Sequence, residues 1–94
     1  MEIKDNTFSR QFETNSPQGL LTVEYSFQEK KIFLTKINTP ENFENQPVID
    51  TLLKNIMELS TEKKFRVVPI HPKIAAFFKK NPKYKDLLPP GIRI

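Results

Sequence analysis

The sequence contains no cysteine and only one histidine, His71. Without cysteine the chain can form neither a disulfide nor a thiolate metal site, and a single histidine leaves too few ligands for a zinc site. Paired catalytic carboxylates, a nucleophile elbow and a P-loop pattern are also missing from the sequence. The sequence therefore predicts no bound metal, and any chemistry must come from few residues.

Long apolar runs are absent, and glycine occurs only at positions 19 and 91. The chain opens with MEIKDNTF rather than with a basic segment followed by an apolar run, so we expect a cytoplasmic protein that does not associate with a membrane. Ninety-four residues suit one domain over residues 1–94, with a single core and a shallow site. The oligomeric state is open between a monomer and a homodimer.

Positive charge is concentrated near the C-terminus. Residues 1–62 carry 6 Lys/Arg and 10 Asp/Glu, whereas residues 63–94 carry 9 Lys/Arg and 1 Asp/Glu. Such a cationic segment can bind nucleic acid, an acidic partner or a polyanionic small molecule, and it can equally be the solvated face of a helix. The lysines concerned are Lys63, Lys64, Lys79, Lys80, Lys83 and Lys85.

Three segments in the first half have the pattern of β-strands. The segment 8–14 places Phe8 and Phe12 on one face of a strand, although their spacing fits a helix equally well, and residues 20–27 alternate between apolar and polar positions. The segment 31–37 follows after a short polar link, so the second and third strands should form an antiparallel hairpin.

The second half predicts two helices and one more strand. Apolar residues recur at helical spacing over residues 47–60, where Pro47 suits the first helical position. Residues 64–70 are apolar on both faces, which predicts an inner strand ending at Pro69. His71 should be the N-cap of a second helix over residues 72–80, and residues 83–88 should add one helical turn. The order β-β-β-α-β-α predicts an α+β fold with a mostly antiparallel sheet, two main helices and a short C-terminal helical turn.

The run VVPIHPKIAAFFKKNPKYKDLL, residues 67–88, resembles the C-terminal signature of the small, single-domain GNAT-like acetyltransferases. Supporting matches precede it in the same order, and they extend the resemblance over nearly the whole chain: Phe12-Glu13, Val23-Glu24-Tyr25, Thr39-Pro40-Glu41 and Leu52-Leu53. The resemblance implies a minimal GNAT fold that binds acetyl-coenzyme A across the loop preceding the main helix. It implies these cofactor-binding positions: Ile37, Asn38, Asn45, Gln46, Val48, Lys80 and Tyr84.

The same resemblance places a glycine-rich pyrophosphate motif, Arg-Gly-x-Gly, at residues 44–47, where this chain has Glu-Asn-Gln-Pro. Asn45 and Pro47 replace the two glycines, which let phosphates approach backbone N–H groups. Pro47 also lacks an N–H group, and Glu44 brings negative charge where the family has a cation.

His71 stands where the resembled proteins usually carry a cysteine near the acetyl thioester. An imidazole there could act as a base or accept the acetyl group, and it could equally be a helix cap. Glu24 is either a general base or a solvated strand residue. Tyr84 either stacks beside an adenine or anchors the last helical turn, and the cationic side chains of Lys79, Lys80 and Lys83 either neutralise phosphates or are solvated.

Three functions are compatible with these features. The first is an acetyl-coenzyme A-dependent N-acetyltransferase in which His71 is catalytic and the acceptor is a small amine or a protein lysine. The second is a non-catalytic GNAT-like binding module that has lost the pyrophosphate-binding glycines. The third, nucleic-acid binding, is the least favoured because Phe77 and Phe78 lie on the apolar stripe of a helix.

Overall fold

The computed structural model describes residues 2–43 and 45–92. Glu44, and with it the expected repulsion of a diphosphate, lies outside the described residues. The strands are β1 (Lys4–Asn6), β2 (Gln11–Ser16), β3 (Gly19–Gln28), β4 (Lys31–Asn38) and β5 (Arg66–Pro69). The helices are α1 (Gln46–Glu62), α2 (Pro72–Lys80) and a 3₁₀ helix, η1 (Pro82–Leu87).

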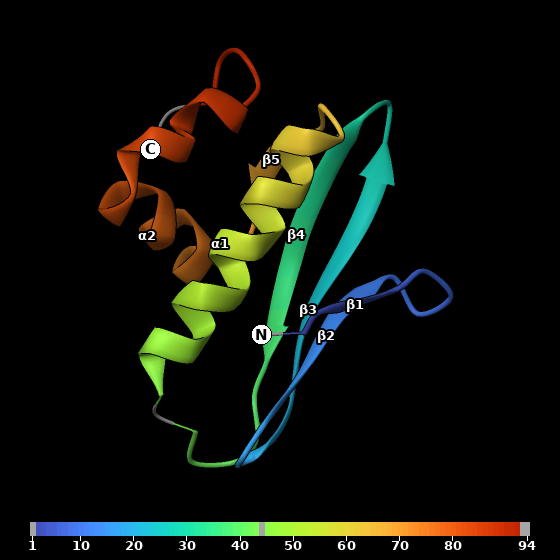
Figure 1. Cartoon of the computed structure of the whole chain (residues 1–94). Helices are drawn as coiled ribbons and strands as arrows, with labels where there is room; N and C mark the ends of the chain where they lie inside the picture. The colour runs from blue at the N-terminus through green and yellow to red at the C-terminus, as the bar shows by residue number, and fades with distance from the viewer. Residues whose placement is uncertain (1, 44, 93–94) are drawn as a thin grey trace.

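The strands form one mixed sheet in the order β1-β2-β3-β4-β5. The first four are joined as antiparallel neighbours, while β5 pairs with β4 in parallel. The expected hairpin is therefore confirmed as β3 and β4. In Figure 1, α1 begins at the end of the sheet where β4 finishes and runs back alongside that strand, as a crossover between parallel strands requires. The α+β class is thus confirmed, with one short strand more than the sequence predicted.

The strand expected over residues 8–14 is wrong at its start. Residues 7–10 form the turn between β1 and β2, and Phe8 is 98% exposed whereas Phe12 is 2% exposed. Arg10 has a φ of 55°, which a continuous strand does not allow. The two phenylalanines therefore do not share a buried face.

The position of β5 also differs from expectation. It was predicted as an inner strand, but in the described part of the chain it lies at the edge of the sheet beside β4. Its apolar residues are explained by different neighbours: Val67 is fully buried in the core, while the half-buried Phe65 just before the strand packs its ring 4.7 Å from that of Phe27.

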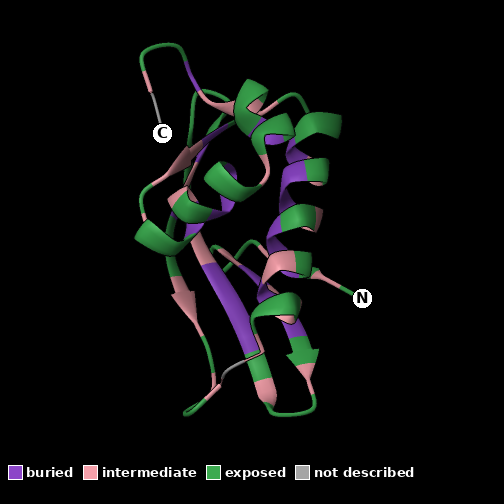
Figure 2. Cartoon of the chain, turned by 90° about the vertical axis from the view of Figure 1, so that its left-hand side faces the viewer, coloured by how far each residue is buried: buried purple, intermediate pink, exposed green. Residues whose placement is uncertain are grey.

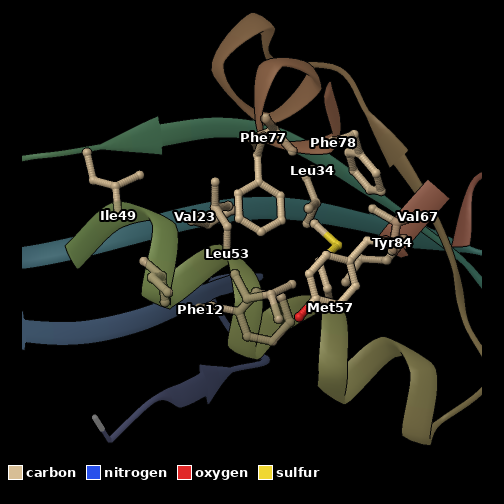
Figure 3. Close-up of a cluster of buried hydrophobic side chains, with 14 of the residues drawn as sticks. Phe12, Val23, Leu34, Ile49, Leu53, Met57, Val67, Phe77, Phe78 and Tyr84 are labelled. Atoms are coloured by element: carbon tan, nitrogen blue, oxygen red, sulfur yellow. The ribbon is translucent and has the colours of Figure 1, made fainter. Parts of the chain in front are cut away.

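One hydrophobic core joins the helices to one face of the sheet. The buried stripe of α1 is confirmed and includes Ile49, Leu52, Leu53 and Ile56, and Figure 2 shows it as a buried band along one side of a helix whose outer side is exposed. The close-up in Figure 3 shows Phe77 and Phe78 of α2 beside Leu34 and Val67 of the sheet. Within the described residues no helix has the length and apolarity needed to cross a bilayer.

Candidate functional site

The parallel strands β4 and β5 separate after four paired positions. Their pairing runs from Lys31 with Arg66 to Leu34 with Pro69. At that point the carbonyl oxygen of Leu34 accepts from two backbone N–H groups, those of Ile70 at 3.0 Å and His71 at 3.3 Å. Beyond this pair of bonds β4 continues to Asn38, whereas β5 has ended and the chain enters α2 at Pro72. The result is an opening between two strand ends with His71 at its apex.

A β-bulge in β4 lies directly beside this apex. Tyr25 of β3 pairs with Leu34 and its neighbour Glu24 pairs with Lys36, so Thr35 is the extra residue. A bulge bends its strand and increases the local twist, and bulges are common next to active sites. The bend at Thr35 therefore explains why β4 leaves β5 at Leu34. The side chain of Thr35 stabilises the bulge by donating to the carbonyl of Glu24 at 3.2 Å.

His71 is the N-cap of α2, as the sequence predicted. Its backbone is extended, with φ −77° and ψ 135°, and its Nδ1 accepts from the backbone N–H of Lys73 at 3.1 Å. Because Nδ1 uses its lone pair in this bond, the neutral ring carries its proton on Nε2. In this tautomer the ring can donate a hydrogen bond from Nε2 but cannot accept a proton there. The catalytic role of His71 stays a prediction.

The start of α1 is also capped by a side chain. Asn45 Oδ1 accepts from the backbone N–H of Val48 at 3.4 Å, and the Asn45 carbonyl accepts from the N–H groups of Val48 and Ile49. Pro47 has no N–H group. The amide of the Gln46 side chain is turned along the helix, where it donates to Asp50 at 2.9 Å. This helix start therefore offers a diphosphate fewer free backbone donors than a glycine-rich loop would.

Five of the predicted cofactor-binding residues lie around one end of the sheet. Ile37 and Asn38 end β4, and the loop that follows leads directly to Asn45, Gln46 and Val48 at the start of α1.

Gly19, at the start of β3, lies close to Pro40 of this loop. Its φ is +133°, and a Cβ atom added there would lie 3.1 Å from the ring of Pro40. A side chain at position 19 would therefore displace the loop that joins β4 to α1.

The other two predicted cofactor residues lie elsewhere. Tyr84 is buried, its ring stacks 5.8 Å from that of Phe77, and its hydroxyl donates to Glu58 at 3.3 Å. Burial, followed by the nearby Glu58, raises the pKa of this phenol. Since Glu58 is twelve residues beyond Gln46, Tyr84 contacts α1 about 18 Å from its start. Tyr84 therefore anchors η1 to α1, and Lys80 is an exposed residue at the end of α2.

Glu24 lies on the sheet face opposite Val23, at a half-buried position. Its carboxylate accepts from the Asn38 amide, which also donates to the hydroxyl of Thr22. Glu13 lies on the same face, and hydrogen bonds from Gln11 and Asn6 lower the pKa of its carboxyl group. On this polar face Glu24 is hydrogen-bonded to Asn38, the last residue of β4. The sequence pattern did not reveal this contact.

Three rings of the cationic C-terminal segment, those of Phe77, Phe78 and Tyr84, are buried and not available for stacking on bases. The exposed fractions of Phe77, Phe78 and Tyr84 are 3%, 0% and 7%. Nucleic-acid binding through these rings would need exposed rings, so only the charge of this segment remains to favour it. Among the described residues, no cluster of three or more His, Cys, Asp or Glu side chains could hold a metal ion.

Comparison with known proteins identifies the family and the fold of the chain. The family model described as GCN5-related N-acetyl-transferase matches residues 11–87, most of the chain. The chain belongs to the GCN5-related N-acetyltransferase family. No curated protein gives a match to it. Among solved structures, a GCN5-like protein of Staphylococcus aureus, determined by NMR and described as a candidate N-acetyltransferase, superposes with a TM-score of 0.73 at 20% identity. The superposition covers 98% of this chain and 90% of that one, and it supports the GCN5-related fold.

The β-bulge beside the opening between β4 and β5 is a feature that the sequence analysis did not predict. The bulge at Thr35 could have been found in the sequence, because the buried positions Ile32 and Leu34 are followed by Ile37 and not by an apolar residue at position 36. A change from even to odd spacing within a strand indicates one extra residue.

Proposed function

We propose that this protein is an acetyl-coenzyme A-dependent N-acetyltransferase whose acceptor is a small amine or a protein lysine. The observation that carries the proposal is the opening that begins at Leu34, with His71 at its apex and the start of α1 beyond its wide end. An extended ligand could lie along the edge of β4 from Asn45 to His71.

The residues of the opening suit one part of the cofactor better than the other. In the described pairing, β4 has no β5 partner from Thr35 to Asn38, so its edge is available to the amide groups of a pantetheine arm. The capped start of α1 is less suited to the diphosphate, because Asn45 occupies the Val48 N–H and Pro47 has none. We therefore expect binding that is weaker than a glycine-rich loop would give.

When bound, acetyl-coenzyme A would supply the activated acetyl group. The protein would contribute position and hydrogen-bond donors. The Nε2–H group of His71 would donate to the carbonyl oxygen at the apex, since the cap at Lys73 fixes the ring and its tautomer. Backbone groups at the edge of β4 would hold the arm in line with that ring.

A non-catalytic binding module is the second candidate. It is favoured by the helix starts themselves, because Asn45 and His71 both direct a side chain at their own helix and thereby occupy N–H groups that could contact a ligand. Such a module would have kept the fold without the transfer reaction.

Calorimetric titration with coenzyme A and acetyl-coenzyme A, followed by a screen of amine acceptors, distinguishes the two candidates. Acetyl transfer requires that acetyl-coenzyme A binds and that an acceptor is acetylated. Binding without transfer to any acceptor class would favour the module. No heat at millimolar ligand would contradict the proposal.

A further inference from the structure

A separate hollow lies at the far end of α1 from the proposed acetyl-transfer site. It encloses about 350 Å³ between the turn at residues 7–10, the hairpin end of β3 and β4, and the last turn of α1. Since α1 has 17 residues, its two ends are about 25 Å apart. In Figure 1 the end of α1 lies next to the β3–β4 turn, away from the loop that precedes the helix. The hollow and the opening between β4 and β5 are therefore different places.

Aromatic rings form the walls of this hollow. Phe27 and Phe65 lie with their ring centroids 4.7 Å apart, and Phe12 and Tyr25 form a second pair at 4.9 Å. Phe27 is 45% exposed, although Leu21 and Val23 on the same face of its strand are buried in the core. Such rings favour a flat apolar group, which can stack on them or meet their edges.

Two hydroxyl groups of the lining, those of Tyr25 and Ser60, already donate hydrogen bonds within the protein. The Tyr25 hydroxyl donates to Asp5 at 2.6 Å, and burial, followed by this hydrogen bond, raises the pKa of Tyr25 to about 12, so the phenol is neutral at physiological pH. The buried Ser60 hydroxyl donates to the carbonyl of Ile56. One carboxylate oxygen of Asp5 therefore already accepts a hydrogen bond from Tyr25.

The charged groups of the lining are two cations and the carboxylate of Asp5, which accepts from the Tyr25 hydroxyl. Arg10, in the turn before β2, and Lys63, the C-cap of α1, are both exposed and both line the hollow. Among the described residues, neither side chain donates a hydrogen bond to another side chain. Their charges would attract an anion and repel an ammonium group.

We propose that this hollow binds a small aromatic carboxylate, whose ring lies among Phe12, Tyr25, Phe27 and Phe65 and whose anion meets Arg10 and Lys63. The volume lies within the range of about 300–1,000 Å³ that is usual for small-molecule pockets. The proposal does not depend on acetyl transfer, because the two sites share no residue.

The test uses 2-naphthoate as the probe and follows the amide signals of the ¹⁵N-labelled full chain by NMR. We expect saturable shifts at residues 27, 63 and 65. The neutral isostere 2-naphthalenemethanol and the cation 2-naphthylmethylammonium should bind at least about tenfold more weakly, since they lack a charge-assisted hydrogen bond. Coenzyme A should leave these signals unchanged, which separates this result from the outcome at the other site.

Two variants test the charges, and a third is a matched control. Arg10→Gln and Lys63→Gln should each weaken 2-naphthoate binding about tenfold, while both positions are exposed enough to leave the fold intact. Lys79→Gln removes the same charge from an exposed position on α2 and should have no effect. Equal affinities for the carboxylate and the alcohol, or shifts outside the hollow, would overturn the proposal.

A second copy of the chain is the alternative occupant. Phe8 is 98% exposed on the turn that borders the hollow, so it could enter the same hollow of another molecule. Shifts at residues 27, 63 and 65 that depend on protein concentration without any probe, and that disappear in Phe8→Ser, would show self-association and contradict a small-molecule site.

Discussion

The two main helices begin in the same way and at related places in the fold. Each has a proline in its first turn and a capping side chain before it, Asn45 for α1 and His71 for α2. The two helix starts differ in the elements of the sheet that lie next to them. The start of α2 meets the apex of the opening between β4 and β5, whereas the start of α1 follows a loop beyond the end of β4.

The difference teaches how this chain departs from its family. By the resemblance, the start of α1 would carry a glycine motif and the start of α2 a cysteine. In this chain Asn45 and His71 stand there, and each caps a helix. The cap at Asn45 removes backbone donors that a diphosphate would use. His71 caps its helix through Nδ1, so the cap does not involve Nε2 of the ring. We therefore expect the first replacement to weaken binding and the second to remain compatible with chemistry.

The largest expected effect concerns the core behind each helix start. Ile74→Ala and Ile49→Ala each remove a buried side chain, with exposed fractions of 0% and 5%. Each should lower the free energy of unfolding by about 2–5 kcal/mol, with the larger loss at Ile74, which is the more completely buried of the two. Urea denaturation followed by circular dichroism measures both. A larger loss at Ile49 would contradict this ranking of the two positions.

The next effect separates the cap at His71 from any role in transfer. His71→Asn keeps a good N-cap residue but loses the imidazole Nε2–H group. We expect unchanged thermal stability and a fall in acetyl-transfer rate of about 100-fold, as for loss of one hydrogen-bond donor to a developing oxyanion. Steady-state kinetics with saturating acceptor measure the rate. An unchanged rate would leave His71 as a cap alone.

A smaller effect is expected at the start of α1. Restoring both glycines with Asn45→Gly and Pro47→Gly should tighten coenzyme A binding by about tenfold, because two backbone sites become available to the diphosphate.

The matched control for the glycine variant is Pro47→Ala, which returns one N–H group but keeps a Cβ atom. Its gain in calorimetric affinity should be smaller. If neither variant gains affinity, the diphosphate does not contact this helix start.

The smallest effect compares the caps themselves. Asn45→Ala and His71→Ala should each cost about 1 kcal/mol of stability. The loss should be greater at His71, whose cap bond is 3.1 Å, than at Asn45, whose cap bond is 3.4 Å. Thermal denaturation of the two variants in parallel gives the comparison. A greater loss at Asn45 would show that bond length does not rank these caps.

Much of the fold could be predicted because local signals were strong and agreed with one another. The stripe of α1, the proline in the first turn of each helix and the β3–β4 hairpin all follow from residue periodicity and turn chemistry. The short strand β1 was missed, since Lys4, Asp5 and Asn6 carry no apolar pattern and only pairing with β2 makes them a strand. Phe8 misled the prediction because its spacing from Phe12 imitates a strand face.

The spatial arrangement of the candidate site residues could be predicted only in part for a related reason, and their roles stay predictions. Asn45, Gln46 and Val48 lie within one stretch of four residues, so their grouping needs no tertiary information. Tyr84 lies beside a lysine-rich stretch, and the sequence left open whether it binds a ligand or anchors a turn. Its contact with Phe77 comes from the preceding helix and its hydrogen bond with Glu58 from the distant α1, so Tyr84 anchors η1 to both helices, and its contact with a cofactor stays a prediction. The proximity of Leu34 to His71 likewise depends on a parallel pairing that no local pattern specifies.

The most direct measurement for the central claim is amide hydrogen exchange with and without saturating acetyl-coenzyme A. If the cofactor lies in the opening between β4 and β5, exchange should slow at residues 35–38 and 70–73, while amides near Phe27 and Lys63 should be unaffected. Protection confined to the basic residues after position 78, or no protection at saturating ligand, would contradict cofactor binding in this opening.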